Sequence, residues 1–216
     1  MKKTKKQGIL ISILLVALFI LWTSLVSCID IQKIGPNGSS VGFATLNGGF
    51  HALTGANMTL YTITDWLGLV PIAVAFGFAV LGLVQWIRRK SFLSVDRNIL
   101  VLGGFYIAVI AVYVFFEYVV INYRPVLIEG YLEASYPSST TMLVMCVMPS
   151  AMMQLSGRIK NRIFRAVILA LFAGFTVFMV VGRLISGVHW ISDIIGGAMI
   201  SAGLVSAYYF FGEYEK

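Results

Sequence analysis

The sequence is poor in charge and in cysteine, and each shortage excludes a class of protein. Only 12% of the 216 residues are Asp, Glu, Lys or Arg, whereas 59% are hydrophobic. Soluble domains carry roughly 25% charged residues, so this composition indicates a protein whose main solvent is lipid. The two cysteines, Cys28 and Cys146, have no paired spacing, which excludes a disulfide framework and a cysteine-based metal site. The length fits a single domain over residues 1–216.

The basic residues are placed to set topology and not to bind nucleic acid. The net charge is +7, but the basic side chains lie in short clusters between apolar runs rather than along one surface. Clustering of this kind is typical of the cytoplasmic loops of membrane proteins. We therefore expect a lipid bilayer as partner and no nucleic acid.

A transmembrane helix needs about 20 consecutive apolar residues. The sequence contains six such candidates, at about residues 8–27, 66–87, 98–121, 138–154, 164–185 and 190–211. The fourth is short and polar at its start, so its entrance faces something other than lipid. The pattern predicts an all-α bundle of six transmembrane helices.

The distribution of Lys and Arg predicts the orientation of this bundle. The N-terminus, the segments 88–97 and 158–165, and the last residue together carry 13 of the 16 basic residues. By the positive-inside rule that side is the cytoplasm, which places both termini inside. We expect a multi-pass protein of a bacterial plasma membrane, with Arg124 and Arg183 at the outer face.

Two features near the N-terminus allow more than one interpretation. Basic residues, an apolar run and Cys28 resemble a lipoprotein signal with its cleavage cysteine, although five further spans favour an uncleaved first helix. The only long loop, residues 29–65, is rich in Gly, Asn, Ser and Thr. We expect it to form a partly ordered cap, with Asp65 capping the second span.

Few ionisable residues are predicted at membrane depth or at the outer helix ends. They come from three different spans, yet the topology sets them all in the outer half of the membrane: Glu117, Arg124, Arg183, His189 and Asp193. Ionisable groups inside a membrane are costly and mark functional sites. The sequence therefore predicts one polar site at the extracytoplasmic face.

His189 and Asp193 are four residues apart at the start of the sixth span, which puts them on one helix face. Asp193 is expected to accept from one ring nitrogen of His189. The other nitrogen is then free for nucleophilic or acid–base chemistry. An ordinary hydrogen-bonded pair at a helix entrance is the structural alternative.

Two arginines favour a phosphate ligand for this site. Arg183 ends the fifth span, six residues before His189, and Arg124 is expected to end the third span, where Pro125 stops it. A guanidinium binds phosphate oxygens in a bidentate manner. Glu117 precedes Arg124 by seven residues, so the two share a face if both lie on one helix. Glu117 is then expected either to pair with an arginine or to act as an acid.

The start of the fourth span is a predicted anion site. Pro137 is followed by hydroxyl residues, and the first N–H groups of a helix point outward with the helix dipole behind them. Such an end binds anions readily. We expect Ser138, Ser139 and Thr140 to contact phosphate, although Ser and Thr also serve as simple helix caps.

These residues resemble the three motifs of the type 2 phosphatidic acid phosphatase family, also called lipid phosphate phosphatases. The family's third motif reads Ser-Arg, five residues, His, three residues, Asp, and here it is Gly182-Arg183 with His189 and Asp193. Its second motif, Pro-Ser-Gly-His, matches residues 137–140 with Thr140 in place of the His. Its first motif reads Lys, six residues, Arg-Pro. This sequence keeps Arg124-Pro125 but has Glu117 in place of the Lys.

The resemblance implies a mechanism and a set of roles. It makes His189 the nucleophile, which forms a phosphohistidine, and Asp193 its orienting partner. Arg124, Arg183 and Ser138 would hold the phosphoryl oxygens. The family uses no metal and no cofactor, and we expect none here.

The departure at Thr140 leaves the substrate open, because the missing His is the family's proton donor to the leaving group. General acid help is worth about 10²–10⁴ in rate. The substrate is then a lipid or prenyl diphosphate, whose leaving group needs little protonation, or Glu117 or His51 supplies the proton. In a third interpretation the protein binds lipid phosphates without hydrolysing them. Glu117 at the position of the family's Lys removes positive charge from the site, which counts against a highly charged diphosphate substrate.

The sequence as a whole predicts a membrane phosphatase that acts on a lipid phosphate or diphosphate. The alternatives are a lipid phosphotransferase and a catalytically degenerate binding protein of the same fold. A channel or transporter is disfavoured, because the charges gather at one face and no pair of broken helices occurs in corresponding halves.

Overall fold

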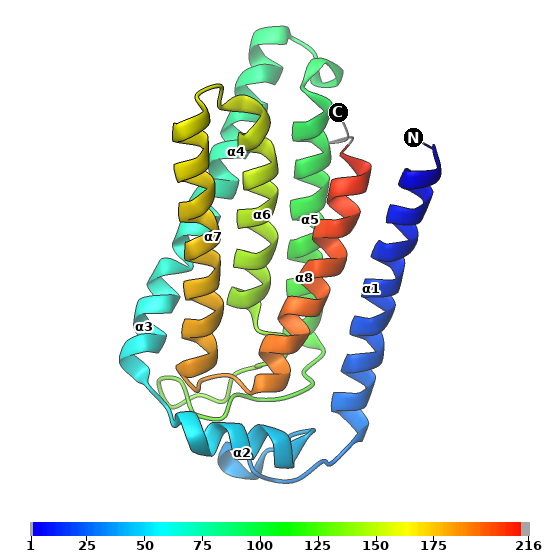
Figure 1. The fold of residues 1–216 in the computed structure, drawn as a ribbon. Coiled ribbons are helices and arrows are strands. Elements are labelled where there is room, and N and C mark those ends of the chain that lie inside the picture. The colour runs from blue at the N-terminus through cyan, green and yellow to red at the C-terminus, as the bar shows by residue number, and fades with distance from the viewer. Residues whose placement is uncertain (1, 213–216) are drawn as a thin grey trace.

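The computed structural model describes residues 2–212, and over this range the chain is a bundle of α-helices (Figure 1). No strand occurs among these residues, only isolated β-bridges in the loops. The helices are α1 (Lys2–Cys28), α2 (Ala44–Thr54), α3 (Met58–Leu67), α4 (Leu69–Arg89), α5 (Arg97–Tyr118), α6 (Ser139–Arg158), α7 (Arg162–Ile185) and α8 (Ile191–Phe211).

Five helical segments are long and apolar enough to cross a membrane: Lys6–Cys28, Met58–Arg89, Arg97–Tyr118, Arg162–Ile185 and Ile191–Phe211. Their outer faces expose large apolar side chains, such as Leu14, Phe76, Ile107 and Leu171. A surface of this kind is stable only in lipid, because exposed apolar patches of that size are rare on soluble proteins. The chain is therefore an integral, multi-pass membrane protein.

The predicted fourth span is α6, which is not among these five segments. It lies in the middle of the bundle and contacts α4, α5, α7 and α8 (Figure 1). Many of its side chains are buried, including the polar residues Thr141, Ser150 and Gln154. A helix enclosed by other helices does not need an apolar surface, since its polar groups find partners inside the protein.

The predicted helix boundaries differ from the structure at two places that matter for the site. The second span begins at Met58 instead of about residue 66, and Asn57 caps it by accepting from the Leu60 N–H. Asp65, which we expected to be the cap, lies inside α3. The third span ends at Tyr118 instead of about residue 121.

The segment between α1 and α3 forms an ordered cap over one end of the bundle. Within it α2 lies across the ends of the long helices (Figure 1). Asn47 of α2 is fully buried, accepts from the Ser192 N–H at 3.1 Å and donates to the Ser192 hydroxyl at 2.9 Å and to the Gly42 carbonyl at 2.7 Å. Side-chain hydrogen bonds of this kind fix α2 to the start of α8.

The two ends of the bundle differ in composition. The start of α1, the end of α8 and the turns α4–α5 and α6–α7 lie at one end (Figure 1). These two turns contain the basic segments 88–97 and 158–165. The cap, the loop 119–138 and the α7–α8 turn lie at the opposite end, where all the predicted site residues are found.

Candidate active site

His189 lies in the short turn that joins α7 to α8. Within this turn Gly187 has a φ of +65°, and a Cβ atom there would lie 1.6 Å from the carbonyl oxygen of Gly55. Only glycine combines this backbone conformation with so close an approach. The Asn57 N–H also donates to the Ser186 carbonyl at 2.8 Å. The connection between α2 and α3 therefore holds the turn that carries the imidazole.

A serine stands between His189 and Asp193. Nδ1 of His189 lies 4.0 Å from the Asp193 Oδ2 atom, too far for a hydrogen bond. The Ser135 hydroxyl lies 3.0 Å from that Nδ1 and donates a short hydrogen bond to the same carboxylate oxygen. The direct contact predicted from the four-residue spacing is thus replaced by the chain His189–Ser135–Asp193.

The Asp193 carboxylate is fully buried, and both of its oxygens accept hydrogen bonds. Oδ2 accepts from Ser135 and from the Trp190 N–H at 3.0 Å. Oδ1 accepts from the Asn122 amide at 3.3 Å and from the Ser192 hydroxyl at 3.2 Å. A buried charge is tolerated only when it is hydrogen-bonded or paired, and these four donors meet that requirement.

The imidazole and the two arginines have buried polar atoms without hydrogen-bond partners. His189 Nε2, Arg124 Nε and Nη1, and Arg183 Nε are buried and make no hydrogen bond. Glu133 Oε2 lies 3.1 Å from Arg124 Nε, but the geometry gives an ion pair without an aligned hydrogen bond. Unpaired buried donors are rare in folded proteins, so these atoms are available to bind a ligand. Donors on two guanidinium groups select an anion such as phosphate.

Burial lowers the pKa of His189 well below its ordinary value, and the positive charges of Arg124 and Arg183 lower it further. The ring is therefore neutral at pH 7. Because Ser135 already donates to Asp193, its oxygen accepts the proton carried by Nδ1. Nε2 then carries the lone pair, the state that a nucleophile requires.

Helix α3 supplies a wall that the sequence had not indicated. The Tyr61 ring centroid lies 4.9 Å from Cζ of Arg183 and 5.7 Å from Cζ of Arg124. Nη1 of Arg183 donates to the Thr64 hydroxyl at 3.4 Å and lies 3.6 Å from Asp65 Oδ1. Cation–π and hydrogen-bond contacts of this kind fix the direction of a guanidinium.

The departure at Gly182 from the family's Ser follows from the closeness of α3. A Cβ atom at Gly182 would lie 2.8 Å from Cγ2 of Thr64. A larger side chain would push α3 away from α7. The glycine therefore allows Thr64 to reach the guanidinium of the next residue, Arg183.

The three predicted anion-binding residues at the start of α6 differ in whether they are already bonded within the protein. Ser138 is the N-cap, its hydroxyl accepts from the Thr141 N–H, and its own N–H donates to the Asp193 carbonyl at 3.0 Å. Ser138 is thus already bonded within the protein. The next two N–H groups, of Ser139 and Thr140, open the helix and have no intrahelical acceptor. These two residues face a pocket.

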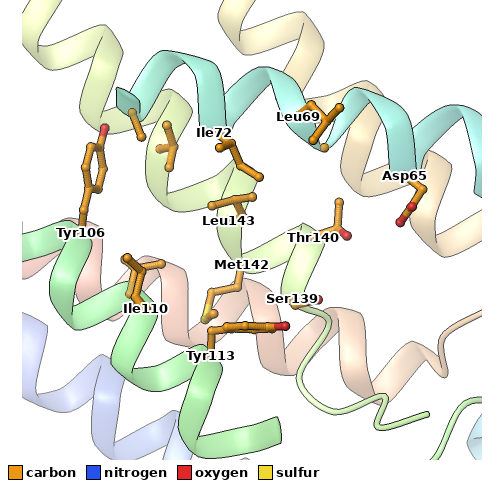
Figure 2. Close-up of a pocket in the computed structure, with 14 residues that line it drawn as sticks. Asp65, Leu69, Ile72, Tyr106, Ile110, Tyr113, Ser139, Thr140, Met142 and Leu143 are labelled. Carbon is orange, nitrogen blue, oxygen red and sulfur yellow. The ribbon is translucent and has the colours of Figure 1, made fainter. Parts of the chain in front are cut away.

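The pocket is a cavity of about 520 Å³ between α4, α5 and α6 (Figure 2). Asp65, Ser139 and Thr140 lie together at one end, and Tyr106 lies at the other. Tyr113 also lines the pocket, near Ser139 and Met142. The other side chains between the two ends are apolar: Leu69, Ile72, Ala75, Val109, Ile110, Met142, Leu143 and Val147. The polar end belongs to the same region as Arg183, because Asp65 contacts that guanidinium.

Arg124 is not on a helix, which corrects the expected geometry of the first motif. Since α5 ends at Tyr118, Arg124 lies in the following loop, where its N–H donates to the Glu133 carbonyl at 3.0 Å. Glu117 therefore does not share a helix face with it. The exposed Glu117 carboxylate lies beside the Tyr113 hydroxyl, and Arg124 pairs with Glu133 instead.

His51 lies in α2 beside Trp190, the residue after His189, and its Nδ1 is buried without a hydrogen-bond partner. Its ring meets the Trp190 ring edge-on at 5.5 Å, and desolvation lowers its pKa. Within residues 2–212, neither His51 nor Glu117 has a hydrogen bond or ion pair with His189, Arg124 or Arg183. The structure therefore brings together Arg124, Arg183, His189, Asp193 and the start of α6. Of the two candidate acids, Glu117 lines a small pocket with Ser135 and Ser139.

Sequence reasoning missed Ser135, Asn122, Tyr61 and Asp65 as site residues. Ser135 and Asn122 lie in the loop 119–138, where no periodicity predicts which side chains point inward. Tyr61 and Asp65 are four residues apart, a spacing that puts them on one helix face. That signal was available, but it required α3 to be predicted as a helix.

Comparison with known proteins defines the class first. Residues 117–216 match the model of the PAP2 superfamily. The resemblance to type 2 phosphatidic acid phosphatases is thereby confirmed, and the matched range contains every predicted site residue except His51.

A solved structure shares the fold. It is the crystal structure of the first transmembrane PAP2-type phosphatidylglycerolphosphate phosphatase from Bacillus subtilis, which is 18% identical to this chain. The TM-score is 0.51, and the match covers 95% of this chain and 97% of the other. No curated protein sequence matches the chain significantly.

Proposed function

We propose that the protein is a membrane phosphatase that hydrolyses a lipid phosphate or lipid diphosphate through a phosphohistidine on His189. The observation that carries this proposal is the buried, unpartnered Nε2 atom of a ring whose pKa is lowered by two arginines, which also have unpartnered buried donors. On its other side the same ring is held by a hydroxyl and a carboxylate. An oriented, neutral imidazole facing an anion site is suited to phosphoryl transfer.

In the proposed first step the Nε2 lone pair attacks phosphorus, and the bond from phosphorus to the leaving oxygen breaks. Positive charge develops on the imidazole as the N–P bond forms. Ser135 and Asp193 stabilise that charge through Nδ1, while Arg124, Arg183 and the first N–H groups of α6 bind the phosphoryl oxygens. Every one of these groups belongs to the chain itself.

The proposed topology is six crossings with both termini in the cytoplasm and the site outside. The order of the helices supports α6 as the sixth crossing: α5 and α7 both run toward the site end, and α6 connects them in the reverse direction (Figure 1). The basic turns at the other end support its assignment to the cytoplasm. In this orientation the active site faces the extracytoplasmic leaflet.

The pocket between α4, α5 and α6 supports a substrate with a hydrocarbon chain. Its volume of about 520 Å³ is within the range of ligand pockets, and its middle is apolar. A head group at Arg183 would leave the chain beside Leu69 and Ile72, in the membrane-spanning part of α4. The Bacillus subtilis relative acts on phosphatidylglycerolphosphate, a monoester lipid, and this class is one of the two substrates we propose.

A second candidate is a protein of the same fold that binds lipid phosphates without turnover. Thr140 and Glu117 favour it, because they stand where the family has its proton donor and its Lys. The preserved chain from His189 to Asp193 opposes it, since a binding protein needs no oriented nucleophile. A lipid phosphotransferase would use the same first step with another acceptor than water.

The test is release of inorganic phosphate from a monoester lipid and from a diphosphate lipid in detergent, for the wild type and for His189→Ala. We expect turnover by the wild type and none by the variant. Full activity in His189→Ala would disprove the nucleophile. If neither lipid is hydrolysed, Thr140→His with Glu117→Lys provides the decision: a strong gain of monoester hydrolysis indicates a degenerate site.

A further inference from the structure

Hydrolysis of a phosphohistidine requires a group that accepts a proton from the attacking water, and the catalytic residues assigned so far do not supply one. His189 is the leaving group of that step. Asp193 is fully buried, and both of its oxygens are occupied by donors. Thr140, at the position of the family's proton donor, is a poor base because its hydroxyl does not take up a proton near neutral pH.

We propose that Asp65 is a further catalytic residue, the general base that activates water for hydrolysis of the phosphohistidine. The inference rests on the proposed function. The Asp65 side chain is 56% exposed, and Oδ1 lies 3.6 Å from Arg183 Nη1. A phosphoryl group bound by Arg183 would therefore lie next to this carboxylate.

The position of Asp65 also fits the direction from which water must come. In phosphoryl transfer the attacking and leaving atoms lie roughly in line with phosphorus. The lipid therefore departs opposite His189, and water enters on that same side. Asp65 is the carboxylate that lines the lipid pocket, and Figure 2 shows it facing Thr140 across the polar end of that pocket.

The backbone around Asp65 is built to hold it there. α3 and α4 meet at Gly68, whose N–H donates to the carbonyls of Thr64 and Asp65 at 3.1 and 3.0 Å. A Cβ atom at Gly68 would lie only 2.8 Å from the Asp65 carbonyl oxygen, so a glycine permits this close junction. The junction sets Asp65 at the pocket while Thr64 contacts Arg183.

The two steps balance without a general acid when the substrate is a diphosphate. In the first, Nε2 bonds to the terminal phosphorus and the bridging P–O bond breaks, with its electron pair staying on the lipid monophosphate. In the second, water oxygen bonds to phosphorus, Asp65 takes its proton, and the N–P electron pair returns to Nε2. A carboxylate base thus favours diphosphate lipids over monoesters, whose alkoxide would leave unprotonated.

The test follows the phosphoenzyme as well as product, using a prenyl diphosphate labelled in its terminal phosphate. In Asp65→Asn we expect kcat to fall by about 10²-fold or more, with an acid-labile, base-stable labelled protein accumulating in one burst. Asp65→Glu should recover part of the turnover. Asp65→Asn with Thr140→His should restore turnover and remove the burst, because a histidine then stands across the same pocket.

The matched control is Glu133→Gln, which removes the carboxylate partner of the other arginine. We expect it to change KM without any accumulated phosphoenzyme. If Asp65→Asn behaves in the same way, Asp65 only positions Arg183 and the inference is wrong. The proposed function fails in a different manner. Either the wild type hydrolyses neither the monoester nor the diphosphate lipid and forms no labelled protein, or His189→Ala still hydrolyses one of them.

Discussion

On the Nδ1 side of His189, the polar groups that orient the ring are bonded within the protein. Asp193 has four donors, and Asn47 and Ser192 exchange hydrogen bonds beneath it. On the Nε2 side, buried donors of Arg124 and Arg183 have no partner. The Nδ1 side is the closed side: its groups are bonded without a ligand, and these bonds stabilise the fold. The Nε2 side is the open side: its donors gain partners only when an anion binds, so they lower the stability of the protein without an anion.

The largest effect should come from removing a cation on the open side. Arg183→Met is expected to reduce turnover about 10²–10³-fold, because one group that stabilises charge in the transition state is lost. Its thermal unfolding temperature in detergent should change little, since loss of the unpartnered buried Nε donor offsets loss of the contacts with Thr64 and Tyr61. Phosphate release and thermal unfolding would be measured on the same preparations.

The control for that variant is Arg89→Met, which breaks an exposed ion pair with Asp96 at the far end of the bundle and should leave turnover unchanged. Inorganic phosphate should raise the unfolding temperature of the wild type but not of Arg183→Met, because only the first binds it. A large loss of stability in Arg183→Met would show that the open side is also structural.

A smaller effect is expected from cutting the contact between the two partners on the closed side. Ser135→Ala removes the hydroxyl between His189 and Asp193. We expect kcat to fall about 10- to 100-fold, in line with about 1–3 kcal/mol for a lost buried hydrogen bond, while KM changes little. Ser201→Ala removes a buried hydroxyl in α8, outside the site, and serves as control. Equal kinetics in both variants would contradict the role of Ser135.

Deeper on the closed side the loss should be in stability rather than in rate. Asn47→Ala leaves the Ser192 N–H and the Gly42 carbonyl without their partner. The free energy of unfolding should fall by about 1–3 kcal/mol, with the rate per folded molecule largely kept. Unfolding in detergent would be compared with Gln32→Ala, an exposed residue of the same cap. A rate loss without a stability loss would reverse our assignment of the two sides.

The smallest effect is a dependence on pH. Because the pKa of His189 is lowered in the folded protein, the unfolded chain takes up a proton near pH 6.5 while the folded protein does not. Stability should therefore decrease as pH falls below about 6.5, by at most about 1.4 kcal/mol per pH unit for this group. His51 contributes with the same sign, since desolvation also lowers its pKa.

The acid limb of the kcat/KM profile should likewise lie below pH 6.5, because the neutral imidazole is the reactive form. Unfolding of the wild type and of His189→Asn between pH 5.5 and 7.5 isolates the contribution of this residue. An acid limb at or above pH 6.5 would mean that His189 is charged in the resting site.

The sequence by itself determined the membrane class, the resemblance to the family and the helices that follow from apolar runs, because hydropathy and motif spacing are local properties. It also determined that Arg183, His189 and Asp193 lie near one another, since only a short turn and one helical turn separate them. The prediction of an anion site at the start of α6 depended on the same local logic.

Only the tertiary structure decided which loop side chains complete the site. Ser135 reaches His189 across 54 positions and Thr64 reaches Arg183 across 119, and no periodicity encodes such contacts. It also removed Arg124 from the third helix and placed Glu117 beside Tyr113. The physical reason is that a hydrogen bond depends on distances of a few tenths of an ångström, which packing of α2, α3 and the loop 119–138 sets together.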